Sequence, residues 1–309
     1  MYLGIDIGGT RVKCGLVGEG GEVLRFAEAG TPGSVEALRA ALGRMTREVV
    51  GGAEVRGAGI GCKGIIDPRT TEVKVLPGVW GFLTGLPLKS LVAGVAAADN
   101  DAKAALAGEA AWGAARGRQN ALLLTLGTGI GGAVLADGRI LRGAGGVAGH
   151  VGHITVEADG PLCFCGNRGC LEAVFSARAV EAAAWGLVHQ GGASPMADAL
   201  RAEPERLTAR FVFEQAAAGD RLARHVVETR VHAFAAALAG LVHAFDPEIV
   251  IMTGSMAEAG EAVFAPVREE LAWRVKGLVQ REVPVVGSGV KDGSGVVGAA
   301  ALAWMAAGQ

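Results

Sequence analysis

One strand–turn–strand pattern occurs twice in this chain and constrains its fold more than any other feature. Residues 4–17, GIDIGGTRVKCGLV, and residues 123–135, LLTLGTGIGGAVL, each contain an apolar run, a turn of glycine and threonine, and a second apolar run. Apolar runs on either side of a glycine turn predict two strands joined by a hairpin. Because a repeated unit indicates a repeated architecture, the sequence predicts two related α/β halves that face each other across a cleft.

The rest of the pattern fits two α/β domains, and 309 residues suffice for one large domain or two medium ones. Apolar strands are predicted within residues 57–67, 95–99, 248–255 and 283–288. Helices are predicted at residues 35–50, 177–190, 204–218, 221–245, 257–275 and 293–308. We place the N-terminal domain at residues 1–115, completed by a helix at about 295–309, and the C-terminal domain with the cysteine loop at residues 116–294.

The composition argues against several classes of protein. Only 19% of the residues are charged and the formal net charge is −2, so there is no basic stripe to neutralise the phosphates of a nucleic acid. The most apolar helical run, residues 231–245, contains His232 and His243 and is too short to span a bilayer, which indicates a buried helix. The N-terminus lacks the features of a signal peptide, and we expect a cytoplasmic protein.

The two glycine turns have a chemistry in common. Without a Cβ in the way, the backbone N–H groups of such turns can approach an anion, and threonine hydroxyls add donors. The alternative is that the glycines only form tight hairpins. The candidate phosphate-binding residues are Gly8, Gly9, Thr10, Gly127 and Thr128. Asp6 precedes the first turn, and a carboxylate beside a phosphate is expected only with a divalent cation such as Mg²⁺ between them. No GKS or GKT follows either turn, so this is not the Walker pattern.

The segment DNDAKAAL begins where a buried strand is predicted to meet a helix. Asp99, Asn100 and Asp101 lie at this junction, which is a usual place for an active site in an α/β sheet. Aspartate and asparagine are also preferred residues at helix N-termini, so capping is the alternative role. Capping does not require three such residues in a row, and we therefore predict that one of them is catalytic.

Three of the five cysteines fall within eight residues. Cys163, Cys165 and Cys170 follow His153 and alternate with glycines that allow a short loop to fold back on itself. An odd number of cysteines in a long chain without a signal peptide argues against disulfides. A Cys3His set completes a zinc tetrahedron, whereas the alternative is a reduced thiol cluster without metal. Cys14 and Cys62 lie in apolar, strand-like surroundings and are predicted to be buried thiols.

Together these motifs resemble the ROK family of bacterial sugar kinases. DIGGTRVKCG and LGTGIGGAV are similar to the two phosphate motifs of the family, and DNDAKAA is similar to its catalytic segment. GHVGHITVEADGPLCFCGNRGCLEA, residues 149–173, resembles its zinc and sugar signature and is the most specific match. IVIMTGS and GVVGAAALA resemble its segments on the nucleotide side. The resemblance covers essentially the whole chain.

The resemblance implies an actin-like ATPase fold, related to ribonuclease H, in a homodimer or homotetramer that phosphorylates hexoses with Mg-ATP. Asp101 would be the general base for the primary hydroxyl of the sugar, and Asp6 would hold Mg²⁺ through water. Gly254 would lie near the adenosine. The implied sugar-binding residues are Gly64, Asn100, His150, His153 and Glu172. A structural Zn²⁺ would be held by His153, Cys163, Cys165 and Cys170.

The sequence departs from the family pattern at three places. His150 stands where family hexokinases usually carry glutamate, and Lys63 precedes Gly64 where the family often has proline. Both changes favour positive charge, so one hypothesis is an acceptor with an acidic or acceptor-rich substituent. The alternative is that His150 is a tolerated variant and Lys63 points to solvent. TGS at residues 253–255 also differs from the usual glycine pair, which leaves the phosphate donor open.

Two rival functions remain at this level. A pseudo-kinase would bind the sugar without turnover, and His150 leaves this alternative open. A transcriptional regulator of the same family would carry an N-terminal winged helix-turn-helix. We do not expect a regulator, because the chain begins with the first phosphate strand and has no basic recognition helix.

Overall fold

The computed structural model of the protein describes residues 1–75, 81–191, 193–290 and 293–308. The chain divides into two compact units. Unit 1 consists of residues 1–119, 133–149 and 288–309, and unit 2 consists of residues 120–132 and 150–287. The chain therefore passes between the units four times. The domain bounds that we placed on the sequence, 1–115 and 116–294, stay a prediction.

The sheet of unit 1 has the strand order β3-β2-β1-β4-β7. Its strands are β1 (Tyr2–Ile7), β2 (Arg11–Val17), β3 (Val23–Gly30), β4 (Ala58–Cys62) and β7 (Val95–Asn100). β1 is antiparallel to β2 and parallel to β4, and β4 is parallel to β7. In this register Asp6, Gly61 and Asp99 are direct neighbours across three strands. The carboxyl ends of β1, β4 and β7 therefore meet at one edge.

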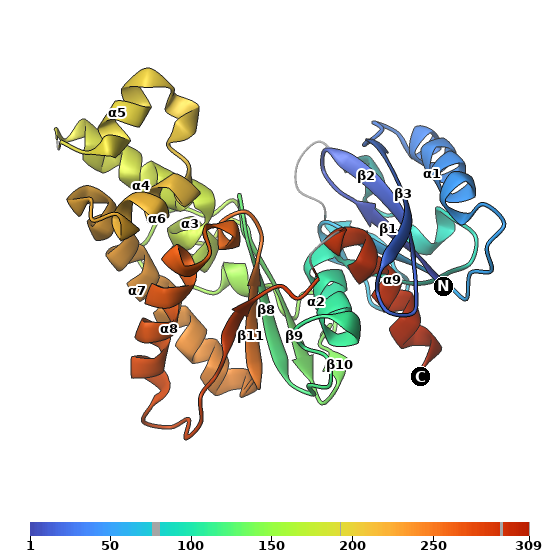
Figure 1. The fold of residues 1–309 in the computed structure, drawn as a ribbon. Helices are drawn as coiled ribbons and strands as arrows, with labels where there is room; N and C mark the ends of the chain where they lie inside the picture. The colour runs from blue at the N-terminus through green and yellow to red at the C-terminus, as the bar shows by residue number, and fades with distance from the viewer. Residues whose placement is uncertain (76–80, 192, 291–292, 309) are drawn as a thin grey trace. The chain divides into compact units, whose positions relative to one another are not determined.

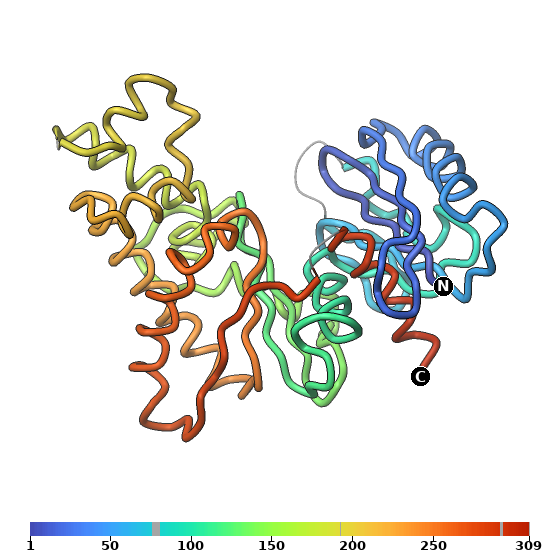
Figure 2. Tube along the Cα trace, in the orientation of Figure 1, coloured from blue at the N-terminus to red at the C-terminus, as the bar shows by residue number. Residues whose placement is uncertain are grey.

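Helices cover both faces of this sheet (Figure 1). α1 (Val35–Val50) packs on one face, while α2 (Asp101–Trp112) and α9 (Ser294–Ala307) pack on the other. Two strand glycines permit the close approach of α9, since a Cβ at Gly4 or Gly59 would overlap a carbonyl oxygen of that helix. In Figure 2 the red helix α9 accordingly lies beside the blue strand β1. Short elements complete the unit, namely β5 (Ile65–Ile66), β6 (Val73–Val75), η1 (Gly81–Leu83) and η2 (Leu88–Ser90).

The second sheet repeats the plan of the first. Its order is β10-β9-β8-β11-β12, with a hairpin on one side and parallel strands on the other. The strands are β8 (Ala121–Leu126), β9 (Ile130–Ala136), β10 (Arg139–Ile140), β11 (Ile249–Thr253) and β12 (Val285–Gly287). The end of β9 and β10 group with unit 1. The duplicated pattern of the sequence is thus present as two sheets of matching design.

Unit 2 contains most of the helices (Figure 1). They are η3 (Val151–His153), α3 (Leu171–Phe175), α4 (Ala177–His189), α5 (Pro195–Ala202), η4 (Pro204–Arg206), α6 (Ala209–Ala217), α7 (Arg221–Phe245), η5 (Ala257–Ala259) and α8 (Glu261–Val275). α7 begins after its N-cap Asp220, and it ends at Asp246, which takes a left-handed conformation. Among the described residues, no helix is both long enough and apolar enough to cross a membrane.

Two helix predictions need correction, and one further helix was missed. The helix predicted at residues 257–275 is interrupted at Gly260, whose φ of 60° does not continue a right-handed helix, so α8 begins one residue later. The helix predicted at residues 204–218 is a short 3-10 turn followed by α6, which the side chain of Thr208 caps. α5 was not predicted, although Ser194 followed by Pro195 is a common start of a helix.

Candidate active site

The three polar residues at the end of β7 have three different roles. Asp99 is buried, and its Oδ2 accepts a hydrogen bond of 2.6 Å from Nε of Arg142. Asn100 is buried too and caps α2, because its Oδ1 accepts from the N–H of Ala102 at 3.0 Å. Asp101 is the first residue of α2, and its side chain is exposed. Capping by Asn100 and a solvent-exposed carboxylate on Asp101 are therefore both present in this segment.

Asp6 and Asp101 are close enough to influence each other's charge. Burial raises the pKa of Asp6 to about 6, Lys13 opposes this increase, and the Asp101 carboxylate adds to it. Surrounding protein also raises the pKa of Asp101, although its side chain reaches solvent; the hydrogen bond from the Ala102 amide and the charge of Lys63 act in the opposite direction. Two carboxylates whose pKa values are both raised form a site that would favour a cation.

The first glycine turn joins β1 to β2 directly beyond Asp6. The amide of Gly8 donates to the carbonyl of Arg11 at 3.0 Å, and Thr31 Oγ1 donates to the carbonyl of Gly8 at 2.8 Å. Gly9 and Thr10, at the tip of the turn, are exposed. The turn is thus held at its base, while its tip is open to a ligand.

Gly64 lies on the segment after β4 and belongs to the same group of residues. Its carbonyl accepts a hydrogen bond of 2.8 Å from Nδ2 of Asn100, and its φ of 102° is one that glycine adopts without strain. Lys63 is exposed, and it is near enough to Asp101 to lower the pKa of that carboxyl. The structure of unit 1 therefore brings together Asp6, Gly64, Asn100 and Asp101 at the carboxyl edge of its sheet.

In unit 2 the second glycine turn lies beside the turn after β11. β8 and β11 are parallel neighbours, with Thr125 opposite Thr253. The amide of Gly127 donates to the carbonyl of Gly129 at 3.0 Å, and Thr128 is exposed. Gly254 has a φ of 97°, and a Cβ there would come within 2.5 Å of the Leu126 carbonyl oxygen. Only glycine fits this close approach, so the predicted phosphate and adenosine residues of unit 2 are adjacent.

Glu172 contacts the same turn. Its Oε2 accepts a hydrogen bond of 2.7 Å from the amide of Ile130, and a Cβ on Gly129 would overlap that carboxylate. The turn η3 packs against Ile130, so closely that a Cβ on Gly152 would overlap the carbonyl of Ile130. His150 precedes η3 and is half-buried. Glu172 thus has a structural partner in addition to its predicted contact with the sugar.

The cysteine loop folds around a single point. One ligand atom from each of His153, Cys163, Cys165 and Cys170 lies within 4.8 Å of all the others. Sγ of Cys163 lies 3.7 Å from Nδ1 of His153, and the sulfur atoms of Cys165 and Cys170 are 3.6 Å apart. Edges of about 3.7 Å are those of a tetrahedron with zinc–sulfur bonds of about 2.3 Å. The donor set and its spacing both fit a zinc ion.

Backbone hydrogen bonds and two glycines give the cysteine loop this shape. The amide of Cys163 donates to the carbonyl of Asn167, and Gly166, with a φ of 90°, turns the chain between them. The backbone of Gly169 passes so close to the carbonyl of Glu157 that a Cβ would overlap it. Without metal, burial raises the pKa of the Cys163 and Cys170 thiols, while the amide of Asn167 lowers that of Cys165. Cys14 and Cys62 are fully buried, as predicted, and lie outside this cluster.

Sequence reasoning missed three charged residues behind the predicted site. Lys103 is completely buried on α2, and its Nζ donates to the carbonyl of Gly146 at 2.6 Å. Arg142 forms the ion pair with Asp99. Glu109, also buried, accepts a hydrogen bond of 2.7 Å from Ala114 N–H and one of 3.0 Å from Gly289 N–H. No local signal marks them, because a lysine in a helix is normally exposed and each has a partner far along the chain.

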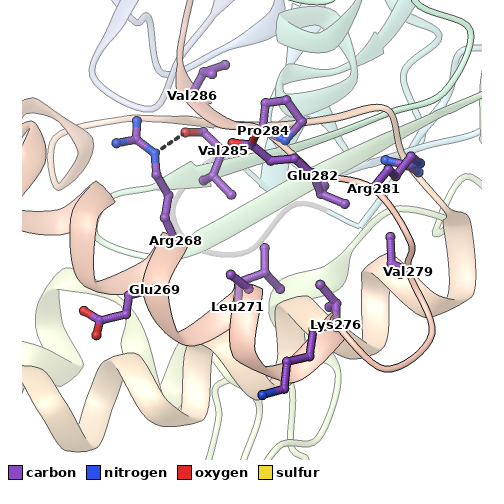
Figure 3. A pocket seen from close by; sticks show the side chains of 13 residues that line it. Arg268, Glu269, Leu271, Lys276, Val279, Arg281, Glu282, Pro284, Val285 and Val286 are labelled. Carbon is purple, nitrogen blue, oxygen red and sulfur yellow. Dashed lines mark hydrogen bonds between the residues drawn. The ribbon is translucent and has the colours of Figure 1, made fainter.

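None of the predicted site residues lines the cavity shown in Figure 3. This cavity of about 710 Å³ lies in unit 2, between α8 and the segment that leads into β12. Nε of Arg268 donates a hydrogen bond of 2.8 Å to the carbonyl of Val285 in its wall. The cavity is therefore separate from the glycine turns and the cysteine loop.

Known proteins resemble this chain over almost its whole length. A model of the ROK family matches residues 2–306. The chain belongs to the ROK family. The glucokinase of Thermotoga maritima is 36% identical to it, over 97% of this chain and 96% of that protein. The N-acetylmannosamine kinase of Escherichia coli O157:H7 is 31% identical, over 97% of both chains.

Among solved structures, a ROK family glucokinase from Streptomyces griseus in complex with glucose and AMPPNP has a TM-score of 0.80 and 32% identity. The match covers 98% of this chain and 99% of that one. The predicted α/β fold of the actin-like ATPase type is thereby confirmed, as is the resemblance that the motifs indicated.

Proposed function

We propose that this ROK protein transfers the γ-phosphoryl group of ATP to the primary hydroxyl of a hexose or hexose derivative, with Asp101 as the general base. The protein is an ATP-dependent sugar kinase by family and by its full-length likeness to glucokinases and N-acetylmannosamine kinases. The observation that supports the assigned base is the position of Asp101, an exposed carboxylate at the first residue of α2 whose pKa is raised.

The proposed reaction assigns a separate task to each group. Asp101 takes the proton of the sugar hydroxyl while that oxygen forms a bond to the γ-phosphorus and the bond from phosphorus to the β-phosphate oxygen breaks, releasing ADP. Asn100 and Gly64 are joined by a hydrogen bond at the carboxyl edge of the unit 1 sheet, and they bind the other hydroxyls of the sugar. Gly8, Gly9, Thr10, Gly127, Thr128 and Gly254 bind the nucleotide. Phosphoryl transfer depends mainly on such positioning and on stabilising charge.

Mg²⁺ is the expected partner of Asp6. Burial raises the pKa of Asp6 to about 6, the Asp101 carboxylate adds to this increase, and a cation would relieve the repulsion between the two carboxylates. When bound, Mg²⁺ neutralises the phosphate oxygens of ATP. The role of Asp6 is to hold the ion through water and thereby to orient the nucleotide.

Zn²⁺ is the proposed occupant of the cysteine loop, with a structural role. Nδ1 of His153 faces Cys163, which would leave Nε2 for a sugar hydroxyl. The metal would keep this loop, with His153 before it and Glu172 after it, in one conformation. The loop then presents both side chains to the sugar without ordering them anew in each turnover.

The proposed acceptor follows from the relatives and from His150 of this chain. Similarity to glucokinases and to N-acetylmannosamine kinases favours a six-carbon sugar and leaves open its substituent at C2. A neutral imidazole at His150 offers one donor and one acceptor, whereas the family's glutamate accepts from two hydroxyls. Lys63 is exposed, as the alternative expects, so the hypothesis of a sugar with additional acceptor atoms rests on His150.

The decisive experiment measures ADP release by the purified protein with a panel of sugars and with no sugar. The proposal predicts ADP release that depends on one hexose or hexose derivative. ATP hydrolysis that no sugar stimulates, with sugar binding intact, would favour the pseudo-kinase instead. Assembly into two or four copies and a cytoplasmic location stay predictions, which chromatography with light scattering and fractionation of the source cells would test.

A further inference from the structure

Lys103 is among the largest fully buried side chains of the described residues. It lies on α2, two residues after Asp101, with no exposed surface. Its Nζ donates a hydrogen bond of 2.6 Å to the carbonyl oxygen of Gly146. A buried ammonium group is costly unless it is paired, so this position needs a reason beyond packing.

The partner of Lys103 belongs to a compact loop of unit 1, residues 142–149. Nε of Arg142 donates to the buried Asp99 at its beginning. The amide of Ala148 returns to the carbonyl of Arg142 at 3.2 Å and closes the loop. In the middle, Gly146 is buried with a φ of 83°, and a Cβ there would overlap the carbonyl of Ile66. The loop is therefore seated tightly on β5.

The loop is attached at two points to neighbouring residues of one segment. Asp99, at the end of β7, holds its first residue, and Lys103, in the first turn of α2, holds its centre. Between them in sequence is Asp101. The loop then runs directly into His150, where the chain leaves unit 1. A shift of the loop on β5 would be transmitted along the backbone to that histidine.

We propose that Lys103 is a positioning residue for the sugar, because its bond to Gly146 fixes the loop that leads directly into His150. This inference rests on the proposed function, in which His150 binds the sugar. Lys103 itself contacts no substrate. Its loss would therefore weaken sugar binding more than nucleotide binding. A residue that only stabilised the fold would affect the binding of both substrates alike.

The experiment uses two variants that disturb the loop from opposite sides. Lys103→Met keeps most of the side-chain volume and removes the ammonium group, whereas Gly146→Ala keeps Lys103 and pushes the loop from β5. The control for Lys103→Met is Lys89→Met, at an exposed lysine. The control for Gly146→Ala is Gly117→Ala, at a glycine with a φ of 78° and no atom near its Cβ position. Steady-state kinetics give KM for sugar and for ATP.

We expect both loop variants to raise the sugar KM by about tenfold or more, with the ATP KM and kcat changed by less than about threefold. The double variant should be no worse than the poorer single variant, because both release the same loop. Native-state trypsin cleavage after Arg142 should accelerate in both and stay unchanged in the controls.

A folded Lys103→Met enzyme with an unchanged sugar KM would overturn the proposal, and so would equal increases in both KM values without faster cleavage after Arg142. If Lys103→Met does not fold, Gly146→Ala decides, because it leaves Lys103 in place. If the wild-type protein phosphorylates no sugar, the proposed function fails. Calorimetric sugar affinity and trypsin cleavage of the same variants would then decide the role of Lys103.

Discussion

The carboxylate of Asp6 packs against the first turn of α9 at Gly295. A Cβ at Gly295 would overlap Oδ2 of Asp6 and would lie 2.7 Å from its Cγ. Because Cβ of Asp6 is also within 3.1 Å, the whole side chain would have to move. The glycine therefore determines where the proposed ligand of Mg²⁺ can point.

Gly295→Ala is expected to reduce kcat/KM for Mg-ATP by about tenfold or more, since displacement of a positioning group by a fraction of an ångström has effects of this size. The dependence of the rate on magnesium concentration should shift to higher values. Gly186→Ala, at a helical glycine of α4 whose Cβ position is open, is the control. Unchanged magnesium dependence in a folded Gly295→Ala enzyme would separate Asp6 from the metal.

Asp6→Asn is expected to make the protein more stable and less active. The folded state holds the proton of Asp6 with a pKa of about 6, against 3.8 for the unfolded chain. Stability from this group is therefore complete below about pH 4 and is lost as the pH rises through 6. At pH 8 without magnesium the asparagine should add on the order of 2 kcal/mol to the free energy of unfolding.

Urea unfolding at pH 8 and at pH 4 measures this effect. The increase in the free energy of unfolding that Asp6→Asn produces should become smaller at low pH, because wild-type Asp6 is then itself protonated. Glu36→Gln, on an exposed part of α1, controls for a change of one charge. An asparagine variant that is less stable than wild type at pH 8 would contradict the raised pKa.

Asp101→Asn and Asp101→Ala should each lower kcat by about 10²- to 10⁴-fold, because both remove the group that accepts the proton. ADP release in the presence of the preferred sugar is the measurement. Asp198→Asn, at an exposed residue of α5, is the matched control. Near-normal rates in both Asp101 variants, with the control also normal, would refute the assigned base.

The cysteine loop should contain about one zinc ion per chain in protein prepared without added metal. Cys163→Ser should lose most of it and lower the free energy of unfolding by several kcal/mol, because binding of a structural metal stabilises the fold directly. Cys14→Ser, at a buried thiol outside the cluster, should keep its zinc. Elemental analysis decides, and metal-free protein that still binds sugar would remove the assignment.

His150→Glu should move the preference among sugars toward plain glucose if the imidazole recognises an acceptor-rich substituent. The readout is the ratio of kcat/KM between glucose and derivatives with an acidic or acetamido group. We expect this ratio to change by about tenfold or more, the effect of one altered polar contact with the substrate. If glucose is already the best substrate of the wild type and the ratio stays the same, the altered-acceptor hypothesis is wrong.

The hydrophobic pattern and the residue spacing of the sequence were sufficient to predict the elements that carry the proposed chemistry. Hydrophobic periodicity gave α1 its bounds, and the polar residues after a buried strand placed Asp101 at the start of α2. The spacing of His153 and the three cysteines predicted a group of ligand atoms that the structure brings together. These features succeed because each depends on residues that are near in sequence.

The residues that sequence reasoning missed depend on partners far along the chain. Lys103 meets Gly146, and Glu109 meets Gly289, and nothing in the local sequence of α2 specifies either partner. A lysine in a helix is normally read as exposed. The interruption at Gly260 has a simpler origin, since a helical pattern does not reveal that one glycine adopts a positive φ.

The position of α9 has a consequence for biosynthesis. β1 and β4 are made early, but the helix that covers one face of them comes from residues 294–307. During translation the part of this face that α9 covers stays exposed while the whole of unit 2 leaves the ribosome. Unit 2 is therefore able to fold first, and until α9 arrives nascent unit 1 presents to chaperones the apolar surface of β1 and β4 on which that helix packs.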